Sequence, residues 1–381
     1  MVYLTLGEGY SGVYKSQVID VCIHLRNEFD KDIKLVSIIS LRNFFQERRK
    51  IKKEIEHAVI LPMMPQFLGW LLNLPLLLLF FLFSKRYSVI CRNVKATNLC
   101  LIIKKIGLLS KVCYDGRGAI KAEREEYLDN NGLKYHEFEL NAVQKSDFRI
   151  AVSNQLVEYW KQEFNYTGSA HLVIPCTLGL SFTSSLLNEE KNIKVRKKLG
   201  FNKKDIVLVY AGSLAGWQSF NLIKDFLNYV LQKNSNVKVL LMSKRDENVN
   251  RILNMFPKDV VCTWVNHREV PDYLAACDYG LLLREDSVTN RVAAPTKFAE
   301  YLSAGLSVII SNTVVDYAEL VEKENLGIVV DNYNLKKIII DKVSYKEKIN
   351  RANFSKKYFS KKSSLNIGKY KELLRALESD L

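Results

Sequence analysis

The chain has 381 residues, which at about 150 residues per domain predicts two domains rather than one. Hydrophobic residues make up 48% of it and aromatic residues 11%, so it can bury ordinary cores and is not a disordered segment. Lysine and arginine number 56 against 41 acidic residues, and the formal charge of +15 favours negatively charged partners: nucleic acid, an anionic membrane surface or phosphorylated small molecules.

The seven cysteines are scattered and form no C-x-x-C pair. Most of them lie in apolar runs, which is typical of small buried residues in a reducing compartment rather than of a disulfide framework. No cluster of His, Cys and Asp has the spacing of metal ligands, so no metal site is expected. The chain starts with the strand-like MVYLTL and shows no signal peptide, so we expect a cytoplasmic location.

The first half alternates strand-like runs with helical patterns, as parallel α/β domains do. We expect a Rossmann-like N-terminal domain over residues 1–182. Its predicted strands cover residues 2–6, 34–40, 88–92, 111–115, 148–153 and 171–175.

An apolar run, FLGWLLNLPLLLLFFLF, occupies residues 67–83. It is shorter than the roughly 20 residues of a membrane-spanning helix, and Asn73 and Pro75 interrupt it. It fits a buried helix of the first domain. It equally fits a patch that lies in the plane of a membrane with Lys85 and Arg86 at the headgroups, and a transmembrane span is the third reading.

A polar, charged stretch at 183–204 is expected to link the first domain to a second, Rossmann-like domain over 183–343, followed by a helical tail over 344–381. Two doubly wound domains place their ligand loops at the carboxyl ends of the strands. The strands predicted in the second domain cover residues 205–212, 237–243, 259–265, 279–284, 306–311 and 327–331.

The segment REDSVTNRVAAPTKFAEYLSAGLSVIIS, residues 284–311, predicts a helix that opens at Pro295 after a poor N-cap, Ala294. The free N–H groups of such a helix start attract anions, and Thr296 and Lys297 add a hydroxyl group and a positive charge. Lys297 and Glu300 share a helix face, so Lys297 is placed for a diphosphate and Glu300 for ribose hydroxyls. The competing reading is an ordinary amphipathic helix with a Lys297–Glu300 surface pair.

Several segments, in order, resemble the GT-B glycosyltransferases of family 4, in the version common among bacterial capsule and cell-surface polysaccharide enzymes. They cover most of residues 110–331. The similar segments are AVSNQLVEYW (151–160), HLVIPC (171–176), YAGSLAGWQSF (210–220), VNHREVPDYLAACDYGLLLR (265–284) and APTKFAEYLSAGLSVIIS (294–311).

The resemblance implies that Glu300 matches the second glutamate of the family's E-x7-E pattern, the one that holds the donor ribose. Val292 stands where the first glutamate would be, Ser213 replaces the usual arginine after the first C-terminal strand, and Gln218 lies near the position of the usual lysine. His267 would lie near the nucleobase, although a loop histidine is more often simply solvated. The diphosphate contacts are assigned to Gly212, Ser213, Arg291, Thr296 and Lys297, with Lys244 and Arg245 in reserve.

In the first domain, LGEGYSG (6–12) contains Gly9 and resembles the family's loop that contacts donor phosphate and acceptor; a plain tight turn explains it as well. YDGRGAIKAEREE (114–126) ends a strand and offers Asp115 and Arg117. The family often has an acidic or histidine group facing the reacting sugar here, so these two are the predicted catalytic residues. A helix-capping Asp115 with a structural Arg117 is the alternative.

These observations predict an α/β protein of two Rossmann-like domains facing a cleft, the GT-B arrangement, with the last helix crossing back to the first domain. The resemblance implies a retaining, metal-independent glycosyltransferase without a cofactor. It would use a nucleotide-diphosphate sugar as donor and a polysaccharide or lipid-linked acceptor, with an anionic membrane surface as a further partner and no nucleic acid. An epimerase of the same fold and a non-catalytic nucleotide-sugar-binding subunit are the alternatives.

Overall fold

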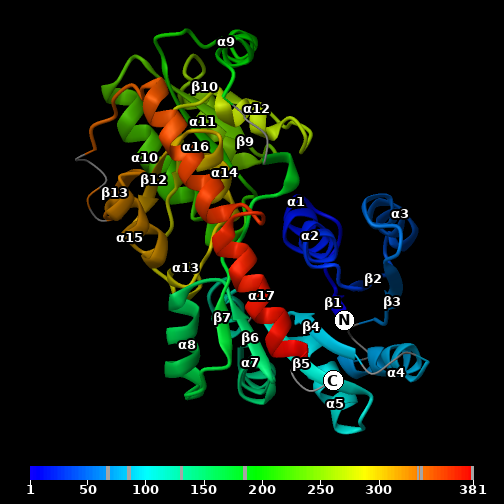
Figure 1. The fold of residues 1–381 in the computed structure, drawn as a ribbon. Coiled ribbons are helices and arrows are strands. Elements are labelled where there is room, and N and C mark those ends of the chain that lie inside the picture. The colour runs from blue at the N-terminus through cyan, green and yellow to red at the C-terminus, as the bar shows by residue number, and fades with distance from the viewer. Residues whose placement is uncertain are drawn as a thin grey trace. The chain divides into compact units, whose positions relative to one another are not determined.

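The computed structural model describes residues 1–65, 69–83, 87–128, 132–182, 187–332, 334 and 338–378 (Figure 1). The chain divides into two compact units. Unit 1 contains Met1–Gly179 and Ser364–Leu381, and unit 2 contains Leu180–Ser363. Each unit is built around one parallel sheet.

Unit 1 has a seven-stranded parallel sheet in the order β3-β2-β1-β4-β5-β6-β7. The strands are β1 (Val2–Leu6), β2 (Lys34–Ser40), β3 (Val59–Met63), β4 (Tyr87–Arg92), β5 (Leu109–Gly116), β6 (Phe148–Ala151) and β7 (His171–Val173). The helices are α1 (Gly12–Tyr14), which continues through a π-helical turn (Lys15–Ile19) into α2 (Asp20–Phe29), α3 (Phe44–Glu54), α4 (Leu74–Leu82), α5 (Val94–Lys105), α6 (Ile120–Glu123), α7 (Gly132–Lys145), α8 (Asn154–Phe164) and α17 (Ser364–Glu378).

Alternate residues of β1 supply two separate hydrophobic cores, because successive side chains of a strand point to opposite faces. Tyr3 belongs to one core, while Val2, Leu4 and Leu6 belong to the other. Helix α17 contributes Tyr370, Leu373, Leu374 and Leu377 to the core that contains Tyr3. The end of the chain is therefore an integral part of unit 1.

Unit 2 has a six-stranded parallel sheet in the order β10-β9-β8-β11-β12-β13. The strands are β8 (Ile206–Ala211), β9 (Val237–Met242), β10 (Val260–Cys262), β11 (Tyr279–Leu282), β12 (Ser307–Ser311) and β13 (Gly327–Val330). The helices are α9 (Glu189–Lys198), α10 (Phe220–Lys233), α11 (Glu247–Met255), α12 (Val270–Ala275), α13 (Val288–Arg291), α14 (Thr296–Ser303), α15 (Val315–Glu324) and α16 (Tyr345–Phe359). The prediction of two Rossmann-like α/β domains is confirmed.

One strand, β3, was not predicted. Its sequence VILPM contains Pro62, which has no N–H to donate and so argues against a central strand. The sheet tolerates Pro62 because β3 lies at its edge and pairs with β2 alone.

The apolar run of residues 67–83 falls partly outside the described residues, as do Lys85 and Arg86. Where described, it forms a 3-10 turn (Trp70–Asn73) and α4. Leu77 and Phe81 are buried in a unit 1 core, whereas Leu79, Leu82 and Phe83 are exposed, Phe83 to 86%. Within the described residues, no helix is long and apolar enough to cross a membrane.

The stretch predicted as a linker, 183–204, instead contains α9; residues 183–186 lie outside the described part of the chain. The linker prediction rested on the many charged residues of this stretch, but one of them, Arg196, is buried in unit 2. Its guanidinium group donates to the carbonyl groups of Ala276 and Asp205 and to the Asp278 carboxylate.

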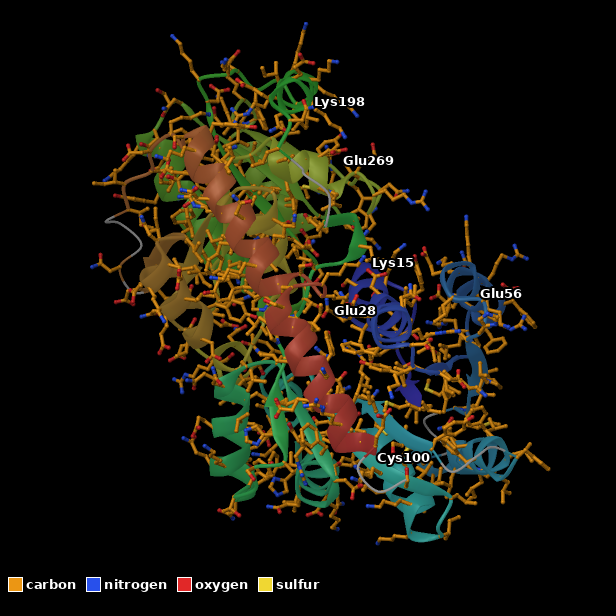
Figure 2. All side chains as sticks on the ribbon, in the orientation of Figure 1. Lys15, Glu28, Glu56, Cys100, Lys198 and Glu269 are labelled. Atoms are coloured by element: carbon orange, nitrogen blue, oxygen red, sulfur yellow. The ribbon has the colours of Figure 1, made fainter. Side chains whose placement is uncertain are left out.

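All seven cysteines are free thiols, and five are buried. Cys100, for example, lies on α5 inside unit 1 (Figure 2). Their burial matches the prediction of small core residues.

Candidate functional site

The strand order of unit 2 reverses between β8 and β11, and ligands of doubly wound sheets bind outside the carboxyl ends of the strands at such a point. The strands β8 and β9 pair along six residues, Ile206 to Ala211, but β8 and β11 pair at only two positions, Leu208 and Val209. The two central strands therefore stop pairing before their carboxyl ends, and we call the region outside these ends the crevice between β8 and β11.

Helix α14 is anchored across this crevice by Tyr301. The Tyr301 ring covers Gly280 of β11, where an added Cβ would lie 2.2 Å from the ring. The Tyr301 hydroxyl accepts a 3.0 Å hydrogen bond from the Ala211 N–H of β8. This bond satisfies a strand N–H that β11 no longer reaches. Since α14 follows β11, its N-terminus lies at the same carboxyl edge of the sheet.

The start of α14 differs slightly from the prediction: Pro295 is the N-cap, and the helix begins at Thr296. No side chain caps the helix, so its first N–H groups keep the anion-attracting character that the sequence predicts. Lys297 and Glu300 share a face, as predicted, and form an ion pair of 2.5 Å. Glu300 is 7% exposed, so this is a half-buried pair rather than a surface pair.

The loop after β8 forms the other side of the crevice. Gly212 is partly buried and Ser213 is exposed, and the Tyr210 hydroxyl donates to the Ser213 carbonyl. Burial raises the pKa of Tyr210 to about 12, so it stays a neutral donor. The loop is joined to the one after β11, because the Glu285 N–H donates to the Ser219 Oγ at 2.9 Å.

Sequence reasoning missed Arg284, which is 6% exposed at the end of β11. Its Nη1 donates to the Trp217 carbonyl at 3.2 Å, and its backbone is held by Ser311, Thr313 and Asn332. Arg284 follows β11 and places a positive charge at the switch point, but its burial and its contacts depend on the tertiary fold.

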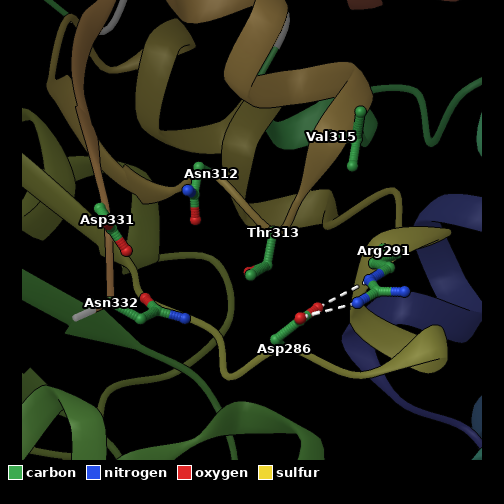
Figure 3. Close-up of a pocket in the computed structure, with 7 residues that line it drawn as sticks. All are labelled: Asp286, Arg291, Asn312, Thr313, Val315, Asp331 and Asn332. Carbon is green, nitrogen blue, oxygen red and sulfur yellow. Dashed lines mark hydrogen bonds and ion pairs between the residues drawn. The ribbon is translucent and has the colours of Figure 1, made fainter.

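A pocket of about 230 Å³ lies along the same edge, beside the ends of β11, β12 and β13 (Figure 3). It is lined by Asp286, Arg291, Asn312, Thr313, Val315, Asp331 and Asn332. Arg291, predicted as a diphosphate ligand, makes a two-bond pair with Asp286 at 2.7 Å each, and its role as a ligand stays a prediction. These hydrogen bonds lower the pKa of Asp286.

The remaining predicted residues of unit 2 follow β9 and β10. His267 is half-buried in the turn before α12, and Glu269 belongs to the same turn (Glu269 is labelled in Figure 2). Lys244 and Arg245 are exposed after β9. The Lys244 Nζ lies 5.8 Å from the ring centroid of Trp264, which is 67% exposed. An exposed tryptophan at a ligand edge is the second residue that sequence reasoning missed.

In unit 1, Asp115 is fully buried in β5. Its carboxylate accepts a 2.5 Å hydrogen bond from the Tyr3 hydroxyl and pairs with Arg117 at 2.8 Å. Arg92 lies 3.9 Å from the same carboxylate and pairs with Glu8 at 2.8 Å. Two carboxylates and two guanidinium groups thus balance one another. Asp115 does not act as the helix cap of the alternative prediction, because the N-cap of α6 is Ala119, and the catalytic role of Asp115 and Arg117 stays a prediction.

The loop of residues 6–12 in unit 1 and the nearby Lys15 are held to α3 by hydrogen bonds and an ion pair. Gly9 is exposed, and the neighbouring Tyr10 N–H donates to Glu47 at 2.6 Å. The Tyr10 hydroxyl and Lys15 both bind Glu54, at 2.9 and 2.7 Å. Gly7, with φ of 77°, makes the turn that any other residue would adopt only under strain.

Comparison with known proteins agrees with this geometry. Residues 208–364 match the family model described as glucosyltransferase 3-like, C-terminal domain. A search of curated protein sequences gives no match. In fold, the chain is similar to Anabaena HepE in complex with UDP, at 14% identity, with 98% of this chain and 99% of that chain covered and a TM-score of 0.72.

Two other solved structures are similar over nearly their whole length. A glycosyltransferase from Rickettsia africae has 13% identity, 100% and 99% coverage and a TM-score of 0.73. WaaG, a glycosyltransferase involved in lipopolysaccharide biosynthesis, has 12% identity, 99% and 100% coverage and a TM-score of 0.68. The chain therefore has the fold of GT-B glycosyltransferases, which confirms the predicted fold class, and its second unit resembles a glucosyltransferase domain in sequence.

Proposed function

We propose that this chain is a glycosyltransferase that binds a nucleoside diphosphate sugar at the carboxyl edge of the unit 2 sheet. The observation that carries the proposal is the uncapped start of α14, with Thr296 and Lys297, beside the crevice between β8 and β11. The glucosyltransferase 3-like family match supports the same class. So does the likeness to HepE, which was solved with UDP and with UDP-glucose.

The donor diphosphate lies against the α14 N-terminus, Lys297, Thr296, Gly212 and Ser213. Arg284 adds a fixed positive charge from beneath the loop after β8. Helix dipole and cations then stabilise the negative charge that develops on the leaving diphosphate.

Glu300 accepts hydrogen bonds from the ribose and keeps Lys297 oriented through their ion pair. Trp264 offers an exposed aromatic face on which the nucleobase stacks, with Lys244 and His267 nearby in the same group of loops.

In this proposal the reaction retains the anomeric configuration and uses neither metal nor cofactor, as in family 4. Unit 1 binds a saccharide or lipid-linked acceptor, with Gly9, Asp115 and Arg117 towards the reacting sugar. The exposed Leu79, Leu82 and Phe83 of the α4 region support peripheral contact with the cytoplasmic face of a membrane.

A non-catalytic nucleotide-sugar-binding subunit is the second candidate, and Val292 favours it. Val292 stands at the position of the family's first glutamate and is 3% exposed, so it presents no polar group to a donor. That alternative requires nucleotide binding without sugar transfer or donor hydrolysis.

Thermal unfolding in the presence of UDP, GDP, ADP, CDP and CMP tests the proposal. A nucleotide at 100 times its Kd stabilises the protein by about 2.7 kcal/mol. We expect one nucleoside diphosphate to do so in the wild type, and Lys297→Ala and Glu300→Gln to weaken its effect because they remove the diphosphate and ribose contacts.

Lys323→Ala, which changes an exposed lysine of α15, is the matched control and should respond like the wild type. Absence of a response to every nucleotide would contradict the proposal, as would equal responses in all variants. A reaction that converts the donor to free sugar or to a glycosylated acceptor would support the transferase. Nucleotide binding without either product would support the binding subunit.

A further inference from the structure

A second pocket in unit 2, of about 190 Å³, opens at the amino ends of β8 and β11, the edge of the sheet opposite the donor site. It is lined by Glu189, Asn192, Ile193, Arg196, Lys203, Ala275, Asp278, Lys342, Val343, Tyr345 and Lys348. These residues come from α9 and the loop that follows it, from the end of α12 and the turn before β11, and from residues 342–348 at the start of α16. The mechanism proposed above uses none of them.

Three cations converge on one carboxylate in this pocket. Asp278 is 1% exposed and accepts from the Arg196 guanidinium at 2.7 Å and from the Val207 N–H at 2.9 Å. Lys342 and Lys348 lie 3.1 and 3.3 Å from the same carboxylate. One negative charge therefore faces three positive charges, two of which, on Arg196 and Lys348, belong to buried residues.

The other charged lining residues do not correct this excess. Lys203 and Glu189 pair with each other at 3.5 Å and are largely exposed, so their charges cancel. The lining thus has four cations and two carboxylates. Excess cations held out of water are unfavourable unless an anion neutralises them. Burial lowers the pKa of Lys342, and Arg196 and Lys348 add to this, although Asp278 opposes it.

The two lysines also keep donor capacity for a ligand, because an ammonium group has three N–H donors. Lys348 donates a hydrogen bond to the Cys277 carbonyl and forms an ion pair with Asp278. Lys342 donates hydrogen bonds to the Asp205 carbonyl and to the Asp278 carboxylate. Each ammonium group has one more N–H than these partners use, and both lysines line the pocket.

We propose that this pocket is a second anion site, which binds the phosphate group of a small molecule between Lys342, Lys348 and Arg196. A phosphate dianion matches the two uncompensated positive charges, and its oxygens accept hydrogen bonds from the ammonium groups. The site is separate from the donor site and does not depend on the proposed transferase activity. Inorganic phosphate and the phosphoryl group of a sugar phosphate share this chemistry.

The test is thermal unfolding of the full-length protein in sodium phosphate, against sodium chloride at the same ionic strength. Phosphate should raise the Tm of the wild type, and Lys342→Gln should need at least about ten times more phosphate for the same shift. Lys342 is the variant of choice because its side chain is 42% exposed, and Asp278 keeps Arg196 and Lys348 as partners without it. Lys346→Gln, an exposed lysine of the same helix start, should respond like the wild type.

Lys297→Ala distinguishes this pocket from the donor site, where phosphate could also bind. The second anion site predicts that Lys297→Ala keeps the phosphate response and that Lys342→Gln keeps nucleoside diphosphate binding. The proposal is overturned if Lys342→Gln responds like the wild type, or if Lys297→Ala alone abolishes the response. If Lys342→Gln lowers the Tm in the absence of ligand, calorimetric titration with phosphate at low temperature measures the binding directly.

Glucose 6-phosphate, titrated in parallel, identifies the source of the phosphate group. If glucose 6-phosphate binds more tightly than inorganic phosphate and Lys342→Gln abolishes this binding, the ligand is a sugar phosphate. If the two anions bind equally and Lys342→Gln abolishes both, the ligand is inorganic phosphate. If neither anion binds, the three cations serve only to hold Asp278, and the proposal fails.

Discussion

Gly280 lies where no side chain fits, because the Tyr301 ring occupies the space that a Cβ would need, within 2.2 Å. The hydroxyl group of the same tyrosine accepts a hydrogen bond from the Ala211 N–H, so a single residue of α14 fills the gap between β8 and β11. The start of α14 is therefore held in place by packing and by a hydrogen bond, which preorganises the cationic end of the helix.

Gly280→Ala should therefore destabilise unit 2 by about 1–3 kcal/mol, since the added methyl group must displace a buried ring. Denaturant unfolding followed by tryptophan fluorescence measures this. Gly118→Ala, at a glycine with open space around it, is the control and should leave the midpoint nearly unchanged. Equal midpoints for the two variants would show that α14 can move away freely and is not anchored as described.

Among the described elements, every strand except β3 was predictable, because near-continuous apolar runs rich in β-branched residues identify buried parallel strands. β3 escaped because Pro62 contradicts a strand unless its edge position is known, which is a property of the tertiary fold. The charges of α9 indicated a linker, and only the contacts of Arg196 with Asp278 reveal a docked helix.

Site prediction from sequence was limited in a similar way. Thr296, Lys297 and Glu300 could be proposed from the sequence because they start a helix after a strand, which is a local pattern, and their roles stay predictions. Arg284 and Trp264 were missed because their relevance depends on which loops the sheet brings to one edge. The pairing of Arg291 with Asp286 likewise depends on the shape of α13 and not on spacing.

Helix α7 carries a buried group that makes the stability of unit 1 depend on pH. Glu139 is fully buried and accepts from the Lys121 and Ile120 N–H groups at 2.8 and 3.2 Å, so it caps the short helix α6. Burial raises the pKa of Glu139 to about 8. The folded state therefore holds this proton more tightly than the unfolded state, in which a glutamate has a pKa of about 4.3.

Between about pH 5 and 8 the unfolding free energy should fall as the pH rises, by up to about 1.4 kcal/mol per pH unit from this group. Glu139→Gln cannot ionise and should remove this part of the slope. Urea unfolding at pH 5.5, 6.5 and 7.5 measures both proteins. Parallel pH profiles would mean that Glu139 keeps an ordinary pKa in the folded protein.

At the scale of the whole molecule, the chain builds the same α/β topology twice. In each unit the first strand lies between the second and the fourth, and six strands follow the order 3-2-1-4-5-6. Unit 1 has a seventh strand, β7, beside its sixth. The chain passes from unit 1 to unit 2 near Gly179 and returns near Ser364, so two connections join the units. A donor that binds unit 2 as proposed should protect unit 2 loops first.

Hydrogen exchange of the full-length protein, with and without the nucleoside diphosphate that stabilises it, tests the central claim most directly. We expect slower exchange in residues 211–219 and 283–303, the two sides of the crevice between β8 and β11, and no comparable change on the opposite edge of that sheet. Protection confined to unit 1, or to the pocket around Asp278, would contradict a donor site at the start of α14.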